Sequence, residues 1–428
     1  MNRGSRMMAA LLCVIMVLGM IGCSSKTTDT GNSSGKKEVT VWSWDPSYNV
    51  AALKEAKAIY EKMNPDVTIN VVEMAKADIE QKLNTILASG QKSELPDVVL
   101  IEDLNSVKYM ESYPNAFVPY DNVDYSKFAS SVDFMTVDNQ TYGVPFGLAT
   151  SAIYYRLDYI EQAGYTEADM KDLTWDQFIE IGTAVKEKTG HEMLTLDPSD
   201  SSLIRIMLQS AGSWYTDNDG KPNFTNNESL KEAFQTMKKM YDSGMTKKVT
   251  GWADYIAAFN NGDVASTITG CWIAPSVMAE DSQSGKWRIA ETPRLNMKDS
   301  VNASSLGGSS WYVLNGTGNE DAAKDFIAKT FASSTELYDN LMKNNGIASM
   351  FIPAFDCESY QAEEEFFGGQ KTTALLSEWT KAVPAVNFGT YTWEGDAIIS
   401  SVFSEVLAGA DIDGSLEAAQ TQFEAQIQ

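Results

Sequence analysis

Apolar and polar positions follow two different periods in the segment from 38 to 101. Residues 38–44 alternate, which predicts a β-strand, whereas residues 49–63 place apolar side chains three and four apart, which predicts a helix. A second strand and a second helix are predicted at 67–71 and 79–87, and 98–101 is an unbroken apolar run. This β-α-β-α-β order, with its continuously apolar third strand, predicts a buried, mostly parallel sheet with helices on both faces.

Aromatic and acidic side chains stand where these predicted strands end. Trp44 and Asp45 follow the first strand, and Glu102 and Asp103 follow the third. Ligands of open α/β sheets bind beyond the carboxyl ends of the strands, so these four residues are candidate ligand contacts. The alternative is that the acids are ordinary loop residues or helix caps.

The stretch from 140 to 156 reads as a strand, a kink and a second strand. Gly143, Pro145 and Gly147 interrupt it, and 151–155 is again β-prone. This pattern is typical of a chain that passes from one lobe to another. Further crossings are predicted in the Gly-kinked strand 306–314 and at 346–353.

The remainder of the chain continues the alternation of strands and helices. Thr174 and Gln177 form a predicted capping box at the start of a helix that ends before Gly190. The other predicted elements are helices at about 230–243, 319–332, 335–344 and 416–427, and a strand at 264–268.

The N-terminus has the organisation of an export signal. Arg3 and Arg6 precede an uncharged run, 7–21, that is short for a membrane span. Ile21-Gly22-Cys23 resembles a bacterial lipobox, which implies cleavage before Cys23 and lipid on its thiol and amine. We therefore expect a signal peptide at 1–22, a flexible tether at 23–37 and a protein anchored to the cell membrane on its extracellular side.

Composition narrows the possible partners. A chain of 428 residues with 43% hydrophobic and 21% charged positions is long enough for two domains. The formal net charge of -25 repels phosphate backbones, so nucleic acid is not an expected partner.

Cys271 and Cys357 could form a disulfide or be two small buried residues, and both possibilities stay open. Without a Cys-x-x-Cys motif zinc is not indicated, and we expect neither a metal nor a cofactor.

Several segments in order resemble one protein family. They are Tyr142 to Pro145 with Tyr154 to Arg156, Leu95 to Val99, Phe259 to Ala265, Leu306 to Trp311, and Ala322 to Phe326. They are similar to segments of the extracellular carbohydrate-binding lipoproteins of ABC importers, the family 1 solute-binding proteins that include maltose-binding protein. The resemblance implies an α/β, two-lobed periplasmic-binding-protein-like fold, each lobe a mostly parallel sheet flanked by helices, with about three hinge crossings.

The same resemblance implies a cleft ligand and a transport partner. The lobes would comprise 38–148 with 306–350, and 149–305 with 351–428. We expect a monomer that captures a sugar or oligosaccharide and delivers it to the permease subunits of an ABC transporter.

A sugar site needs flat aromatic platforms and polar groups in the plane of the ring. The candidate aromatic contacts are Trp44, Phe146, Trp214, Trp272, Trp311 and Trp393, and the candidate polar and backbone contacts are Asp45, Glu102, Asp103, Gly308, Glu394 and Asp396. Carboxylates suit vicinal diols because they accept from two hydroxyls at once. For each tryptophan the alternative is a core position, and for each acid it is a solvated surface charge.

Two other functions are compatible with parts of the sequence. Paired carboxylates also serve glycoside hydrolases, although no pair here has a defined separation. Tyr154-Tyr155 is similar to the tyrosine pair of ferric-iron-binding relatives. His191 is the only histidine, so a Ser-His-Asp triad has no support, and we expect a binding protein rather than an enzyme.

Overall fold

The computed structural model describes residues 36–129 and 131–427. The predicted signal peptide and Cys23 lie outside the described residues, as does all of the tether but its last two positions. Within the described ranges, no helix is both long and apolar enough to cross a membrane.

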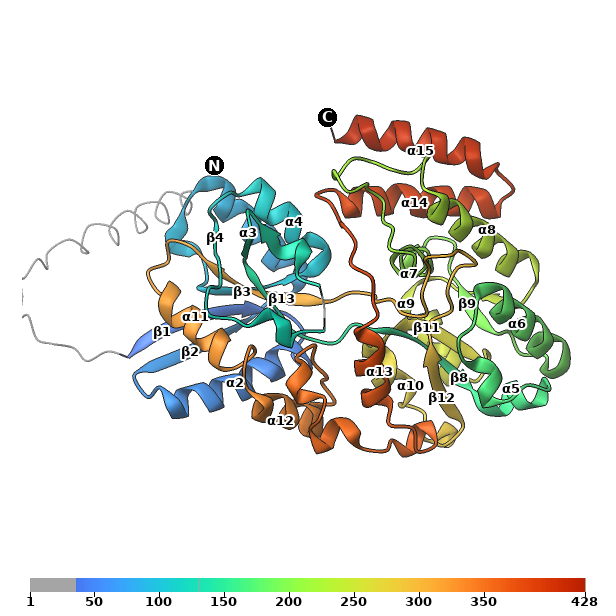
Figure 1. The fold of residues 1–428 in the computed structure, drawn as a ribbon, viewed down its shortest axis with the longest axis horizontal. Helices are drawn as coiled ribbons and strands as arrows, with labels where there is room; N and C mark the ends of the chain where they lie inside the picture. Colours follow the sequence, from blue (N-terminus) through green and yellow to red (C-terminus); the bar gives the residue numbers. More distant parts are fainter. Residues whose placement is uncertain (1–35, 130, 428) are drawn as a thin grey trace, which may run out of the picture. The chain divides into compact units, whose positions relative to one another are not determined.

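A six-stranded sheet organises the first lobe (Figure 1). Its strands are β1 (Lys37–Ser43), β2 (Val67–Glu73), β3 (Val98–Glu102), β4 (Phe117–Val118), β7 (Gly143–Pro145) and β13 (Ser309–Leu314). The order is β2-β1-β3-β13-β4, and β7 also pairs with β13. β1 runs parallel to β2 and β3, whereas β13 is antiparallel to β3, β4 and β7. A strand from late in the chain is thus inserted beside β3.

Helices cover both faces of this sheet, as the sequence predicted. They are α2 (Asn49–Met63), α3 (Lys76–Ser89), α4 (Asp103–Ser112), α11 (Glu320–Lys329) and α12 (Thr335–Asn345). On β3, Val98 and Leu100 share a core with residues of α2, α11 and α12, while Val99 and Ile101 share another with residues of α3 and α4. Because successive side chains of a strand point to opposite faces, the unbroken apolar run of β3 supplies both cores.

The second lobe is built around a three-stranded sheet of β8 (Ser151–Arg156), β11 (Ser266–Gly270) and β12 (Trp287–Glu291). Both β11 and β12 pair antiparallel with β8, so the expectation of a mostly parallel sheet in this lobe is corrected. Periodicity identifies a strand but not its direction. A parallel pair, β9 (Leu194–Leu196) and β10 (Thr246–Lys248), lies nearby, and a parallel bridge from Glu192 to Val264 joins the two sheets.

Helices surround these strands. They are α5 (Leu157–Gln162), α6 (Trp175–Thr189), α7 (Ser202–Ser210), α8 (Glu228–Asp242), α9 (Gly251–Asn260), α10 (Ala274–Val277), α14 (Thr392–Leu407) and α15 (Ile412–Gln426). The predicted capping box of α6 is formed, with Thr174 and Gln177 bonding reciprocally. The short turns at 352–354 and 358–361 contact α12 of the first lobe, the turn at 365–367 contacts β12 of the second, and α13 (Thr372–Thr380) packs on the turn at 358–361.

Three segments pass between the lobes side by side. Leu148 N–H donates to the carbonyl of Ala348 at 2.9 Å, and Leu306 N–H donates to the carbonyl of Ala149 at 2.9 Å. These bonds tie the segment after β7 to the one before β13 and to the one after α12. The third segment begins at Gly346, whose φ of 66° ends α12 in the left-handed region that favours glycine.

Candidate functional site

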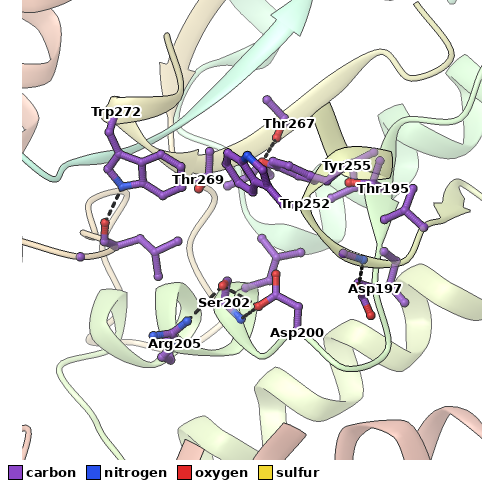
Figure 2. A pocket seen from close by; sticks show the side chains of 18 of the residues that line it. Thr195, Asp197, Asp200, Ser202, Arg205, Trp252, Tyr255, Thr267, Thr269 and Trp272 are labelled. Carbon is purple, nitrogen blue, oxygen red and sulfur yellow. Dashed lines mark hydrogen bonds between the residues drawn. The ribbon is translucent and has the colours of Figure 1, made fainter. Parts of the chain in front are cut away.

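The principal cavity lies at the carboxyl end of β3 and extends over the second lobe. Figure 2 shows its second-lobe walls from close by. The cavity volume of about 430 Å³ falls within the usual range for small-molecule sites. Its lining residues from the first lobe are Glu102, Leu104, Leu306 and Gly307, the last two in the crossing segment before β13. The other lining residues come from β9 and the loop after it, α7, α8, the position after β10, α9, β11 and the turn after it, and the start of α14.

One wall of the cavity is aromatic. Trp252 and Tyr255 stand on α9, and Trp272 follows β11 (Figure 2). The rings of Trp252 and Trp272 are 5.8 Å apart between centroids, with their planes inclined by 40°. The indole N–H of Trp272 donates to the carbonyl of Leu306 at 2.9 Å, which holds this ring in place. Trp252 is 56% exposed and Trp272 39%, so the wall presents apolar surface to a ligand.

The facing wall carries acceptors and a cation (Figure 2). Asp200 accepts from the backbone N–H of Ser202 at 2.9 Å, and Asp197 accepts from the backbone N–H of Gly251 at 2.7 Å. Burial alone would raise the pKa of Asp197, but hydrogen bonds from Gly251 and Ser199 outweigh it, so the pKa is below its usual value. Asp197 is therefore an ionised acceptor at neutral pH.

Arg205 is the cation of this wall, and its contacts orient it. A guanidinium N–H donates to Ser202 Oγ at 3.1 Å. Its Nε lies 3.4 Å from Asp396 Oδ1 without a well-formed hydrogen bond. The guanidinium carbon is 5.2 Å from the centroid of the Trp393 ring. Because guanidinium has five donors in a fixed plane, Arg205 retains donors for a ligand.

Three of the predicted site residues line this cavity: Glu102, Trp272 and Trp393. Glu394 lies next to them, and its carboxylate pairs with Lys108 at 2.7 Å. Glu102 Oε2 is 2.6 Å from Lys76 Nζ, so the first lobe presents a paired carboxylate to the cavity.

Trp44 and Asp45 do not reach the cavity. Trp44 is half-buried against both cores of the first lobe. Asp45 has a φ of 60° and accepts from the backbone N–H groups of Ser47 and Tyr48 at 3.0 and 3.1 Å. This turn is the local capping role that was the alternative interpretation of Asp45.

Other predicted contacts are corrected by their burial. Phe146 and Trp311 are fully buried and pack together with ring centroids 5.5 Å apart, so neither presents a face to a ligand. Trp214 is 4% exposed, and its indole N–H donates to Thr392 Oγ1 at 3.1 Å. These three aromatic residues are core positions, which was the alternative given for the tryptophans.

The acids Asp103 and Asp396 are also buried, and each is satisfied internally. Asp396 accepts from the hydroxyls of Ser201 and Tyr215, both at 2.6 Å. Asp103 accepts from Ser310 Oγ at 2.7 Å, and burial raises its pKa to about 7. Gly308, with a φ of 111°, leaves room for this carboxylate, because a Cβ there would lie 2.4 Å from Asp103 Oδ2. Asp103 and Gly308 form a packing contact beside the cavity.

The structure adds site residues that sequence reasoning missed: Asp197, Asp200, Arg205, Trp252 and Tyr255. Asp197 and Asp200 stand in a turn after a short strand. Acidic residues are common in turns, so this position alone does not indicate a ligand site. Trp252 and Tyr255 carried a clearer signal, since aromatic residues three apart at the start of a helix share one face.

The structure also bears on the possible disulfide, iron site and metal site. Cys271 and Cys357 are free thiols, so the possible disulfide is not formed. Tyr154 and Tyr155 are both 1% exposed and are not available to bind iron. In the part of the chain that is described, no group of three His, Cys, Asp or Glu side chains could hold a metal ion.

Comparisons with known proteins place this geometry in a family. The model of a family described as bacterial extracellular solute-binding protein matches residues 55–368. The lactose-binding protein of Rhizobium radiobacter is 45% identical over 91% of this chain and 93% of its own length. The arabinooligosaccharide-binding protein of Halalkalibacterium halodurans is 24% identical over 92% and 90%. The chain belongs to the bacterial extracellular solute-binding protein family.

Solved structures agree on the fold. A crystal structure of an extracellular solute-binding protein of family 1 has a TM-score of 0.78 at 18% identity, covering 91% of this chain and 99% of that one. The sugar-binding protein MalE from Xanthomonas citri has a TM-score of 0.77 at 20% identity, covering 91% and 97%. The predicted two-lobed α/β class is confirmed.

Proposed function

We propose that this protein captures a neutral sugar outside the cell and delivers it to the permease subunits of an ABC transporter. The observation that carries the proposal is the cavity itself, in which adjacent indoles of Trp252 and Trp272 face a wall of fixed carboxylates and a guanidinium. Indoles stack on the C–H faces of a pyranose, while the carboxylates and Arg205 bond its hydroxyls.

The ligand we propose first is lactose or a related β-galactoside. The support is the 45% identity to a lactose-binding protein over nearly the whole of both chains. A cavity of about 430 Å³ is compatible with a ligand of that size.

A thermal-shift screen against mono- and oligosaccharides, with lactose included, tests the proposal. A ligand that binds only the folded state raises the melting temperature by mass action, by an amount set by its concentration relative to Kd. We expect lactose to raise it, and titration calorimetry then gives the affinity. If no sugar of the panel raised the melting temperature and calorimetry detected no heat of binding, the sugar-binding proposal would be wrong.

Binding without catalysis is part of the proposal. The relatives named above are binding proteins, and the cavity carboxylates of Asp197 and Asp200 are each engaged by backbone N–H groups. Incubation with lactose followed by chromatography would reveal hydrolysis as steady release of monosaccharide. We expect the disaccharide to be recovered intact.

Export and anchoring complete the proposal. A lipid on Cys23 would hold a monomeric protein at the extracellular side of the membrane, with 23–37 as the tether. Replacement Cys23→Ala is expected to abolish labelling by a fatty-acid probe and to leave the precursor uncleaved. Unchanged labelling would rule out this anchor.

We also propose that the lobes, comprising 38–148 with 306–350 and 149–305 with 351–428, close on the ligand by bending at the three crossings. Hinge closure around a ligand is a motion characteristic of periplasmic binding proteins as a class, and the proposal extends that behaviour to this chain. Small-angle scattering should show a smaller radius of gyration with ligand. An unchanged radius at saturation would favour a rigid, preformed cleft.

A further inference from the structure

A second hollow adjoins the principal cavity on the first-lobe side. It is a groove of about 440 Å³ lined by Lys76, Glu80, Asn84, Asn105, Lys108, Tyr109 and Trp393. The first three residues are on α3 at spacings of four, and the next three are on α4 at spacings of three and one. Residues three and four apart share a helix face, so the groove is formed by the facing surfaces of two neighbouring helices together with Trp393.

The groove and the cavity share a boundary. Trp393 lines both hollows. Lys76 lines the groove, its Nζ is 2.6 Å from Glu102 of the cavity, and it stands 5.8 Å from the centroid of the Trp393 ring. A ligand that fills the cavity and extends past Trp393 would therefore enter the groove beside Lys76.

The polar groups of the groove are suited to sugar hydroxyls. Asn105 Nδ2 donates to Glu80 Oε1 at 3.2 Å, and Asn84 Nδ2 donates to the hydroxyl of Tyr109 at 3.4 Å. Each amide has a second N–H, so both retain a donor. The carbonyl oxygen of Asn84 already accepts from the hydroxyl of Tyr113 at 3.2 Å, whereas that of Asn105 remains an acceptor for a ligand. Trp393 and Tyr109 add aromatic surface to these groups.

The charges in the groove favour a neutral ligand. Lys76 pairs with Glu102 at 2.6 Å, and Lys108 pairs with Glu394 at 2.7 Å. Both cations thus have carboxylate partners, whereas binding an acidic sugar would require one of these pairs to be broken.

We propose that this groove is an extension subsite, which takes the outer units of a neutral oligosaccharide whose first units occupy the cavity. The inference rests on the proposed function, because it assigns the groove to the same ligand. A cavity of about 430 Å³ is near the lower end of the range for small-molecule sites, so a longer chain has to leave it.

The test is an affinity series with chain length. Kd is measured by calorimetry for lactose and for galacto-oligosaccharides of three and four units. We expect Kd to fall by about fivefold or more from lactose to the four-unit sugar, which corresponds to about 1 kcal/mol. The variants Asn84→Ala and Glu80→Ala should lose this gain and keep the lactose Kd of the wild type within about twofold.

Gln81→Ala is the matched control, because Gln81 is an exposed residue of the same helix that lines a different hollow with Trp42. It should keep the full gain with chain length, and melting temperatures confirm that all three variants fold. Equal affinity for all lengths, or a gain that survives both groove variants, would overturn the subsite and leave the proposed function standing. Failure of the wild type to bind any member of the series would overturn both.

Discussion

The two lobes contribute to the cavity in very different proportions. The second lobe supplies both walls, the aromatic one on α9 and after β11 and the polar one on α7 and the loop before it. The first lobe contributes Glu102, Leu104, Leu306 and Gly307 at the edge. A ligand in this cavity therefore makes most of its contacts with the second lobe. The first lobe adds a smaller part of the binding free energy when it closes on the ligand. This asymmetry is compatible with capture on one lobe followed by closure of the other.

The largest expected effect concerns the support of the polar wall. Asp396→Ala removes the counter-ion of Arg205, and both side chains are only 12% exposed. Leaving a buried charge without its partner typically costs about 3–5 kcal/mol. Urea unfolding should show a loss of this order. Asp413→Ala, which removes an exposed partner of Lys231 in the same lobe, should cost less than about 1 kcal/mol. Equal losses for the two variants would contradict the role of Asp396.

The buried Asp103 of the first lobe should make the unfolding free energy depend on pH. The pKa of Asp103 is raised to about 7 chiefly by burial, and the nearby Glu102 adds to the rise, while the bond from Ser310 lowers it. In the unfolded chain an aspartate titrates near 3.9, so between about pH 4 and 7 the folded state binds the extra proton. Stability due to this group is therefore full below pH 4 and is lost as pH rises to 7.

Asp103→Asn removes this titration and isolates its effect. Relative to the variant, the wild type should lose up to roughly 4 kcal/mol of unfolding free energy between pH 4 and 8, which is the shift converted at 1.36 kcal/mol per unit. The measurement is urea unfolding of both proteins across that range. A difference that does not change with pH would show that Asp103 does not titrate there.

The next largest effect is expected from loss of an aromatic platform, which should weaken ligand binding. Trp252→Ala is expected to cost about 1–3 kcal/mol of binding free energy to the proposed sugar, because the indole face no longer covers the ring. Glu102→Gln on the first lobe should cost less, about 0.5–1.5 kcal/mol, the scale of one hydrogen bond. Calorimetry compares them, and Tyr241→Ala is the control because this exposed residue of α8 lies outside the cavity lining. A larger loss for Glu102→Gln than for Trp252→Ala would reverse the asymmetry between the lobes.

The smallest effect is expected where the lobes meet directly. Lys108 of α4 pairs with Glu394 of α14, and the side chains are 42% and 34% exposed. Partly exposed pairs contribute about 0–1 kcal/mol, and salt screens them. Lys108→Met should therefore weaken sugar binding by no more than about 1 kcal/mol at low salt and less at high salt. A double-mutant cycle with Glu394→Gln measures the coupling, and a coupling above that value would make this pair a principal determinant of closure.

Several features of this protein were determined by the sequence alone. The unbroken apolar run of β3 requires burial on both faces, and it is buried on both. The glycine and proline interruptions at 143–147 predicted a crossing between lobes, and the segment from β7 to β8 does join the two sheets. The position of Glu102 at the carboxyl end of β3 predicted a place at the site, and Glu102 lines the cavity.

Other features were decided by the tertiary structure. Glu102 and Asp103 are neighbours in the sequence, yet one faces the cavity and the other is buried. The reason is that α4 begins at Asp103, and Ser310 of β13 and Gly308 just before that strand pack against it. Trp272 and Trp311 both follow glycines, but Trp311 lies within an inner strand of a sheet covered on both faces, whereas Trp272 follows the end of an edge strand. Local pattern specifies that a side chain is apolar and in a strand. Whether that side chain meets a core or a ligand depends on which distant segments pack over it.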